Sequence, residues 1–340
     1  MRYGHFDDAA KEYVIETPAT PLPWINYLGN KDFFSLISNT GGGYSFYKDA
    51  KLRRVDSADA KPVETWSPTF LPCKTPLDSY KCRQGIGYTV FEASKRGIES
   101  KLTAFVPLHT NAEINRLDVT NTTDEPAVID VTGSVEWCLW NAVDDSSNFQ
   151  RNLSTGEVEI ERETDATLLY HKTEFKERRN HYAFYGVNAP VVGFDTSRDE
   201  FLGQFNGWDT PQVMLGYIEV AKDQKWEDPN DPAKVGIINK KPAHELFRRF
   251  ATVEQVEAAL KELNSYWSEL LTTYSVDSGD EKLDRMVNIW HQYQCMVTFN
   301  MSRSASYYES GMGRGMGFRD SNQDLLGFVH LIPERARERI

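Results

Sequence analysis

Three arginines and two aspartates gather near the end of the sequence, in a stretch that also holds four glycines and two side-chain amides. Guanidinium groups present forked hydrogen-bond donors that suit phosphate, carboxylate or paired hydroxyls. Glycines let the backbone turn and approach a ligand closely. The stretch therefore predicts a site for an anion or a polyol, although a polar loop between two helices would also account for it. The five charged residues are Arg303, Arg314, Arg319, Asp320 and Asp324.

A second polar stretch, residues 140–152, lies between two predicted strands. It is rich in amides, has the aromatic residues Trp140 and Phe149 toward its ends, and includes Gln150 and Arg151. Such a loop could offer hydrogen bonds and stacking faces to a sugar. A solvated loop explains the same residues equally well.

Composition argues against several partners and sites. The 340 residues carry a net charge of −12, which disfavours nucleic acid or an anionic membrane, since both need basic surfaces. The four cysteines are dispersed and fit no zinc site, so we expect reduced thiols in the cytoplasm. The seven histidines form no i,i+4 metal pair, and no nucleophile elbow, zinc-protease helix or phosphate loop occurs. Neither a signal peptide nor a membrane-spanning run is indicated.

The elements that would position these residues change in kind near residue 250. Before it, short runs of β-branched and aromatic residues between glycine and proline predict an antiparallel β-sandwich. The clearest of them, 128–139, alternates with Ile129 and Val131 on one face. After it, Thr252 with Gln255 forms a capping box before an apolar stripe of helical period that reaches Leu270.

The helical pattern then continues. Ser278 with Glu281 forms a second capping box, and the following apolar stripe leads toward Phe299. Pro333 suits the first turn of a further helix. The stretch 303–324 therefore follows one predicted helix and leads toward another.

Long ordered segments of the chain resemble the inverting cellobiose phosphorylases and their chitobiose phosphorylase relatives, with cellobiose phosphorylases as the close match. The resemblance extends over nearly the whole sequence and does not depend on one short motif. The segments that carry it are MRYGHFDDAAKEYVI at 1–15, PWINYLG at 23–29, GGYSFYKDA at 42–50, WNAVDDSSNFQRNLS at 140–154, DEKLDRMVNIW at 280–290, QCMVTFNMSRSAS at 294–306 and GRGMGFRDSNQDLLGFVHLIPERARERI at 313–340.

This resemblance implies an architecture and a reaction. It implies an N-terminal β-sandwich over 1–248, a helical linker over 249–276 and the first part of an (α/α)6 catalytic barrel over 277–340. Inorganic phosphate would attack the anomeric carbon of the non-reducing glucose of cellobiose, giving α-glucose 1-phosphate and glucose with inversion. No metal or cofactor is implied beyond phosphate as a co-substrate, and the family implies a homodimer.

The same resemblance assigns roles to residues. Arg303 corresponds to the phosphate-binding arginine, and Arg314 with Asp320 to the pair that holds the non-reducing glucose. Gln150 and Arg151 correspond to the pair that reaches the reducing-end subsite from the sandwich. Arg319 and Asp324 would support the loop through an ion pair. The general acid would be an aspartate beyond Ile340, so we expect the isolated polypeptide to be inactive.

Some alternatives stay open at this point. The stretches at 55–65 and 203–216 are shorter than the family pattern, which leaves open deletion or trimming there. Chitobiose or a longer cello-oligosaccharide could replace cellobiose as the substrate. A non-catalytic, β-rich carbohydrate-binding module would fit the polar loops as well, and it would bind cellobiose without phosphate-dependent turnover.

Overall fold

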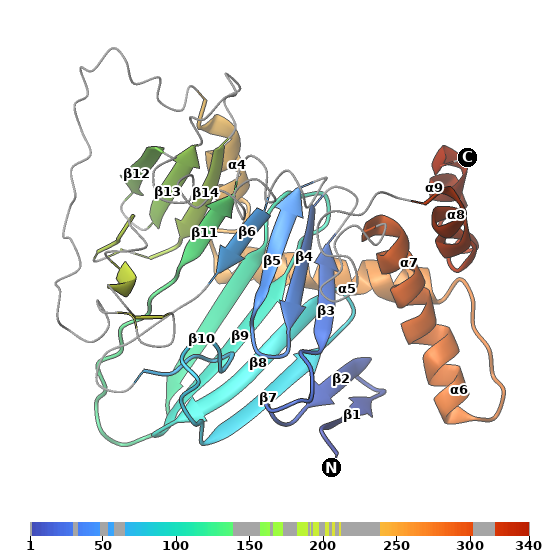
Figure 1. The fold of residues 1–340 in the computed structure, drawn as a ribbon, viewed down its shortest axis with the longest axis horizontal. Coiled ribbons are helices and arrows are strands. Elements are labelled where there is room, and N and C mark those ends of the chain that lie inside the picture. The colour runs from blue at the N-terminus through green and yellow to red at the C-terminus, as the bar shows by residue number, and fades with distance from the viewer. Residues whose placement is uncertain are drawn as a thin grey trace.

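A β-rich part and a helical part lie side by side in the computed structural model (Figure 1). The structure describes residues 2–29, 33–47, 54–57, 65–138, 157–163, 166–172, 182–189, 191, 193–196, 201–203, 206–207, 211, 239–301 and 317–339. The antiparallel sandwich and the helices expected from the sequence are confirmed. The predicted domain limits at 248 and 276 remain predictions.

Two antiparallel sheets form the sandwich. The first has the order β1-β2-β7-β8-β9-β10 and the second the order β11-β6-β5-β4-β3. The first consists of β1 (Gly4–Asp7), β2 (Glu12–Ile15), β7 (Ser79–Gln84), β8 (Tyr88–Lys95), β9 (Ile98–Phe105) and β10 (Ile114–Asn121). The second consists of β3 (Ile25–Gly29), β4 (Phe33–Ser38), β5 (Gly43–Tyr47), β6 (Arg54–Ser57) and β11 (Val135–Cys138).

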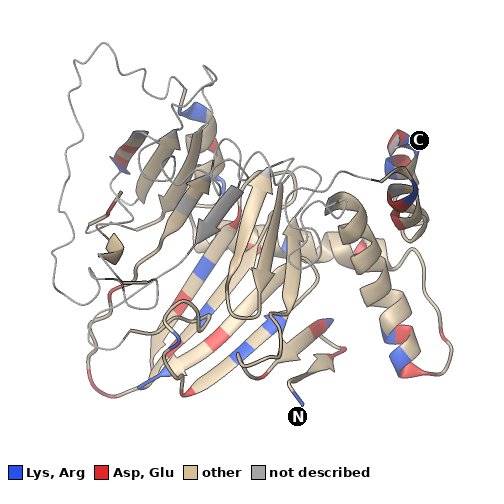
Figure 2. Ribbon diagram, in the orientation of Figure 1, with Lys and Arg blue, Asp and Glu red and all other residues tan. Residues whose placement is uncertain are grey.

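The core between the sheets is apolar. Phe91 of β8 and Ile15 of β2 are fully buried there, and Leu28 of β3 and Phe33 of β4 pack against them. All six residues of β4 are buried, because its other face packs within a second apolar cluster that includes Phe34. Strands β3 to β5 accordingly contain no charged residue, whereas β7 to β10 carry charges of both signs (Figure 2).

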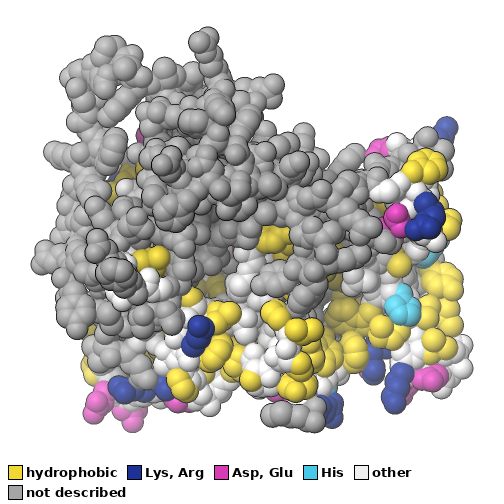
Figure 3. All heavy atoms as spheres, in the orientation of Figure 1, with side chains coloured by type: hydrophobic (Ala, Val, Ile, Leu, Met, Phe, Trp, Pro, Cys, Tyr) yellow, Lys and Arg dark blue, Asp and Glu magenta, His cyan; other side chains and the backbone are white. Residues whose placement is uncertain are grey.

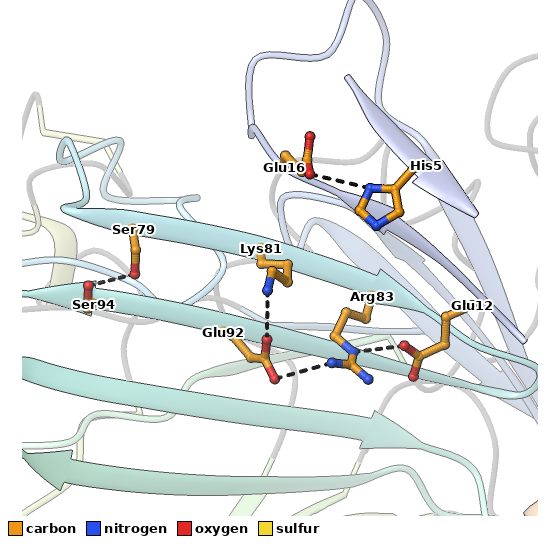
Figure 4. Close-up of polar contacts among 8 residues, drawn as sticks. All are labelled: His5, Glu12, Glu16, Ser79, Lys81, Arg83, Glu92 and Ser94. Atoms are coloured by element: carbon orange, nitrogen blue, oxygen red, sulfur yellow. Dashed lines mark hydrogen bonds and ion pairs between the residues drawn. The ribbon is translucent and has the colours of Figure 1, made fainter. Parts of the chain in front are cut away.

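Charged side chains form a row on the face of the first sheet that points away from this core (Figure 4). Glu12 is 3% exposed, and its carboxylate accepts hydrogen bonds from Arg83 (2.8 Å) and the Tyr88 hydroxyl (2.7 Å). Glu92 continues the row to Lys81. A buried carboxylate is tolerated only when it is paired and hydrogen-bonded, so this network satisfies Glu12 and ties β2 to β7 and β8.

A small third sheet packs against a helix beside the sandwich. Its strands are β12 (Glu157–Glu163), β13 (Ala166–Lys172) and β14 (Tyr182–Val187), and the helix is α4 (Lys241–Arg248). Leu168 and Tyr170 are fully buried between the sheet and α4. His171 of β13 stacks on Trp137 of β11, with ring centroids 6.4 Å apart and planes 14° apart. This stack joins the small sheet to the sandwich.

Helix α5 (Val253–Leu271) joins the β-rich and helical parts. The predicted capping box is confirmed, since Thr252 accepts from the Gln255 amide and the Gln255 side chain accepts from the Thr252 amide. Its apolar face buries Leu263 and Trp267 against the sandwich residues Ile86 and Phe105. Full burial of a side chain such as Leu263 contributes about 2 kcal/mol, so this face holds the two parts together.

The helices after α5 continue the same core. They are α6 (Glu281–Arg285), a π-helical turn η2 (Met286–Trp290), α7 (His291–Met301), α8 (Phe318–Leu326) and α9 (Pro333–Arg339). Hydrophobic side chains are visible where these helices meet the sandwich (Figure 3). Within the described residues, no helix is long and apolar enough to cross a membrane.

The N-terminal hairpin contacts the start of the helical part. Arg285 forms a two-pronged ion pair with Asp8 and lies over the ring of Phe6, and Phe6 packs on Trp290. The bidentate geometry makes this pair more specific than an ordinary surface ion pair. It also lowers the pKa of Asp8, chiefly through the hydrogen bonds from Arg285.

Two local predictions were wrong. Residues 128–134 form no strand: Val128 is 99% and Val131 66% exposed, and only β11 of the predicted run pairs with a neighbour. Alternating apolar residues give a strand only where a partner edge and a buried face are present. In addition, α6 is capped by Asp280, whose carboxylate accepts from two backbone amides, while Ser278 bonds to Asp284.

Gly87 provides a test of the contact between the sandwich and α5. Its φ is +84°, and an added Cβ would lie 2.8 Å from Nε1 of Trp267. Gly87→Ala should therefore lower the free energy of unfolding by about 2–4 kcal/mol, from backbone strain and from crowding. Gly279→Ala is the matched control, because Gly279 has φ +76° with nothing within 4 Å, and it should lose only about 1–2 kcal/mol. Equal losses in denaturant unfolding would contradict the assigned contact.

His171 predicts how stability depends on pH. Burial lowers its pKa from 6.5 to about 4, so the unfolded chain takes up the proton first as the pH falls. The contribution of His171 is present above pH 6.5 and is lost toward pH 4, at a cost of about 1–3 kcal/mol. His171→Phe keeps an aromatic ring beside Trp137 and should reduce this loss in unfolding curves measured between pH 7 and pH 4. His291→Gln, at an exposed position, should keep the wild-type slope. An unchanged slope in His171→Phe would refute the assignment.

Candidate active site

The predicted anion- and polyol-binding stretch, 303–324, begins two residues after α7, and its last residues, 318–324, belong to α8. The structure describes the residues on both sides of 302–316, which are Met301 at the end of α7 and Gly317 before α8. Arg303 and Arg314 lie outside the described residues, so their roles remain predictions. The structure does describe how α7 and α8, the helices on either side of residues 302–316, are held in place.

Asp320 lies in the first turn of α8, at the third helical position. Its carboxylate lies over Gly317, where an added Cβ would be 2.3 Å from Oδ2, so a side chain at position 317 would displace the carboxylate. A negative charge at this end of a helix is favoured by the exposed backbone amides and the helix dipole. The helix start therefore holds the Asp320 carboxylate within the predicted binding stretch, three residues after Gly317.

Arg319 and Asp324 occupy the same helix. Arg319 is 82% exposed and pairs with Asp320 at 3.3 Å; an exposed pair of this kind contributes little to stability. The expected support of the loop by Arg319 and Asp324 through an ion pair stays a prediction. Asp324 lies near Cys295 of α7, whose thiol pKa is raised by burial and by the Asp324 charge. It thus marks where α8 meets α7.

Residues at and after the end of α8 pack on α7. Gly327 packs so closely on Cys295 that an added Cβ would lie 2.5 Å from Sγ. Just after α8, Phe328 packs on Phe299 of α7 with ring centroids 4.6 Å apart, and Arg335 of α9 donates to Asn300 of α7 at 2.8 Å. Because the segment with α8 and α9 packs on α7, the described residues that flank 302–316, Met301 and Gly317, are held relative to each other.

The second predicted loop, which carries Gln150 and Arg151, lies outside the described residues. It begins after β11 and ends before β12. Trp137, next to the last residue of β11, is the residue that stacks on His171. The strand before the loop is therefore tied to the small sheet that follows the loop.

The strand after this loop is fixed by a polar network. Glu161 of β12 accepts from the Tyr170 hydroxyl at 3.0 Å and contacts Nε2 of His244 at 2.8 Å. Burial alone would raise the Glu161 pKa, but hydrogen bonds from Tyr170 and His244 and the charge of Lys240 outweigh it and lower the pKa. Lys240 also pairs with Glu159 of β12 at 2.8 Å. These contacts fix β12 against α4.

Of the predicted site residues, the structure brings together Arg319, Asp320 and Asp324 on α8. The other four lie outside the described residues, so their distances from α8 stay open. Sequence reasoning missed Tyr293, treating it only as part of an apolar stripe. A phenolic hydroxyl inside such a stripe indicates that a buried hydrogen-bond partner exists, although the sequence does not identify that partner.

Comparison with known proteins gives two family matches in chain order. Residues 11–226 match the model described as glycosyl hydrolase 94, supersandwich domain, and residues 266–340 match the glycosyl hydrolase 94 superfamily, catalytic domain. The first match covers well over half of the chain. The sandwich and the helical part thus each correspond to a domain of one family.

Several curated relatives align with essentially the whole chain. An N,N'-diacetylchitobiose phosphorylase of Vibrio furnissii is 29% identical over 100% of this chain and 46% of its own length. A 3-O-beta-D-glucopyranosyl-beta-D-glucuronide phosphorylase and a solabiose phosphorylase of Paenibacillus borealis are 24% and 23% identical, each over 99% of this chain and 45% and 47% of their own lengths. The chain spans about half the length of these relatives. By its two domain matches, the chain belongs to the glycosyl hydrolase 94 family.

Proposed function

We propose that the protein is a glycoside phosphorylase, with cellobiose and inorganic phosphate as its substrates and α-glucose 1-phosphate and glucose as its products. The observation that carries the proposal is the ordered match of both parts of the chain to one family. The relatives named as phosphorylases align with all or nearly all of the chain. No cofactor is needed for this reaction, because phosphate itself is the nucleophile.

The proposed reaction divides its work among the predicted residues. Arg303 holds phosphate, and Arg314 with Asp320 holds the glucose unit that is transferred. Gln150 and Arg151 contact the leaving glucose. Forked guanidinium donors suit the phosphate oxygens, and the Asp320 carboxylate at the start of α8 suits sugar hydroxyls. The described position of Asp320, beside the end of the glycine-rich stretch, supports this division.

The bond changes follow from inversion. A phosphate oxygen bonds to the anomeric carbon on the face opposite the leaving oxygen, and the bond from that carbon to the leaving oxygen breaks. The leaving oxygen takes a proton from an aspartic acid, which we expect C-terminal to residue 340. An inverting hydrolase needs a second carboxylate to activate water. Phosphate is already anionic, so arginines that bind and orient it replace that base.

The identity of the disaccharide is the finer part of the proposal. Cellobiose is favoured by the long motifs shared with cellobiose phosphorylases, such as PWINYLG at 23–29 and GGYSFYKDA at 42–50. N,N'-diacetylchitobiose is the alternative, because relatives named for it are 29% identical over the whole chain. At 29% sequence identity, the residues that line the substrate pocket can differ between this protein and those relatives. The substrate therefore has to be measured.

We expect the complete protein, including the segment that carries the general acid, to release glucose 1-phosphate from cellobiose only when phosphate is present. The assay compares cellobiose with N,N'-diacetylchitobiose, each with and without phosphate, and identifies the anomer of the product. Arg303→Ala should lower kcat/KM for phosphate by about 10²-fold or more, because a charged oxyanion donor is lost. Arg248→Ala, on the exposed side of α4, is the matched control and should retain phosphate dependence.

Each outcome of this assay has a distinct meaning. Phosphate-dependent product from N,N'-diacetylchitobiose alone would replace the proposed substrate and leave the reaction class standing. Cellobiose binding without any phosphate-dependent product would favour a non-catalytic carbohydrate-binding protein. A fully active Arg303→Ala variant would refute the assignment of the phosphate site.

A further inference from the structure

Tyr293 connects α7 to the β-sandwich through its hydroxyl. The residue is 4% exposed. Its hydroxyl donates to the backbone carbonyl of Tyr27 in β3 and accepts from the backbone amide of Gly87 at 3.2 Å. Tyr27 belongs to one sheet, and Gly87 lies in the turn between two strands of the other. A single side-chain oxygen from the helical part therefore contacts both sheets.

The junction of the two sheets that binds this hydroxyl is held by a hydrogen-bond network around Asn26. The side-chain nitrogen of Asn26 donates to the carbonyls of Gly85 (2.9 Å) and Tyr88 (2.8 Å) and lies 3.0 Å from the hydroxyl of Thr89. Asn26 Oδ1 accepts from the Tyr27 amide at 3.0 Å and lies 3.3 Å from the Tyr293 hydroxyl. This network fixes β3 relative to the turn between β7 and β8, so Tyr293 binds to a preformed junction.

The rest of the same helix face is packed as well. Tyr293, Met296 and Val297 are spaced so that they share one face of α7. The ring of Trp267 from α5 meets the Tyr293 ring at 5.0 Å and 76°, an edge-to-face contact. Met296 is 5% exposed, and Val297 packs on the aromatic cluster of β4 and β5. Rotation or sliding of α7 would break all these contacts at once.

Arg303 follows this helix almost immediately. It lies two residues after Met301, and Tyr293 lies eight residues before Met301, which is about 12 Å along a helix. Arg314 is four residues from the start of α8 and thirteen from the end of α7. A change in the direction of α7 should therefore disturb Arg303 more than Arg314.

We propose that Tyr293 is a positioning residue for phosphate binding, whose hydroxyl fixes on the sandwich the helix that ends two residues before Arg303. This inference rests on the proposed function, in which Arg303 binds phosphate. It predicts an effect that is specific for phosphate, because the disaccharide is held largely by residues nearer α8 and by the loop between β11 and β12.

The test is Tyr293→Phe in the whole protein. The ring should stay packed on Trp267 while the hydroxyl is lost. We expect the KM for phosphate to rise about tenfold, equivalent to about 1.4 kcal/mol, while the KM for the disaccharide changes by less than about twofold. Tyr170→Phe is the matched control, because Tyr170 is fully buried and its hydroxyl donates a hydrogen bond to Glu161. It should lower thermal stability and leave the KM for phosphate unchanged.

Thermal unfolding gives a second readout that does not need turnover. Phosphate should raise the unfolding midpoint of the wild type, since a ligand that binds only the native state stabilises it. Tyr293→Phe should need about ten times more phosphate for the same rise, in keeping with the KM. Val297→Ala is a milder change on the same helix face and should give a smaller shift in the same direction, which keeps the test open if Tyr293→Phe folds poorly.

The inference and the proposed function can fail separately. If the wild type shows phosphate-dependent turnover and Tyr293→Phe changes only stability, as Tyr170→Phe does, Tyr293 has a structural role and the inference is wrong. If the wild type shows neither turnover nor stabilisation by phosphate, the proposed function is wrong and the inference fails with it.

Discussion

The burial of one face of α5 is the interaction on which the arrangement of the chain depends. Leu263 and Trp267 are nearly inaccessible to solvent because they lie between the sandwich and the later helices. The same cluster includes Phe105 of the sandwich and Phe328 after α8. Without this helix, neither part would have a partner for that surface, and the loops that carry the predicted site would lose their common frame.

The sequence predicted the kinds of element well and their limits less well. The capping box at Thr252 predicted the start of α5 because the signal is local and contained within four residues. The prediction of a strand over all of 128–139 was wrong, because alternation of apolar and polar residues indicates a possible strand but not whether a partner strand is available. The π-helical turn η2 had no signature, since its extra residue follows from how the helix packs.

The sequence predicted which residue types form the candidate site, but it did not predict the contacts that hold these residues in place. Clustered arginines and glycines predicted binding of an anion or a polyol, and the family resemblance assigned the roles. The helix start that holds Asp320 over Gly317 follows from local geometry that sequence only suggests. Tyr293 could not be assigned, because its partners are backbone groups of β3 and of the turn before β8, far away in the chain. Long-range contacts of this kind need a tertiary structure before they can be seen.

The separation of these partners along the chain has a consequence for how the protein folds. The Gly87–Tyr293 hydrogen bond joins residues 206 positions apart, and the Asp8–Arg285 pair spans 277 positions. Closing such large loops costs entropy that is recovered only after the junction of the two sheets exists to receive the helices. The sandwich should therefore form first and serve as the template on which α7 docks. The residues proposed to bind phosphate would then be among the last parts of the chain to reach their final geometry.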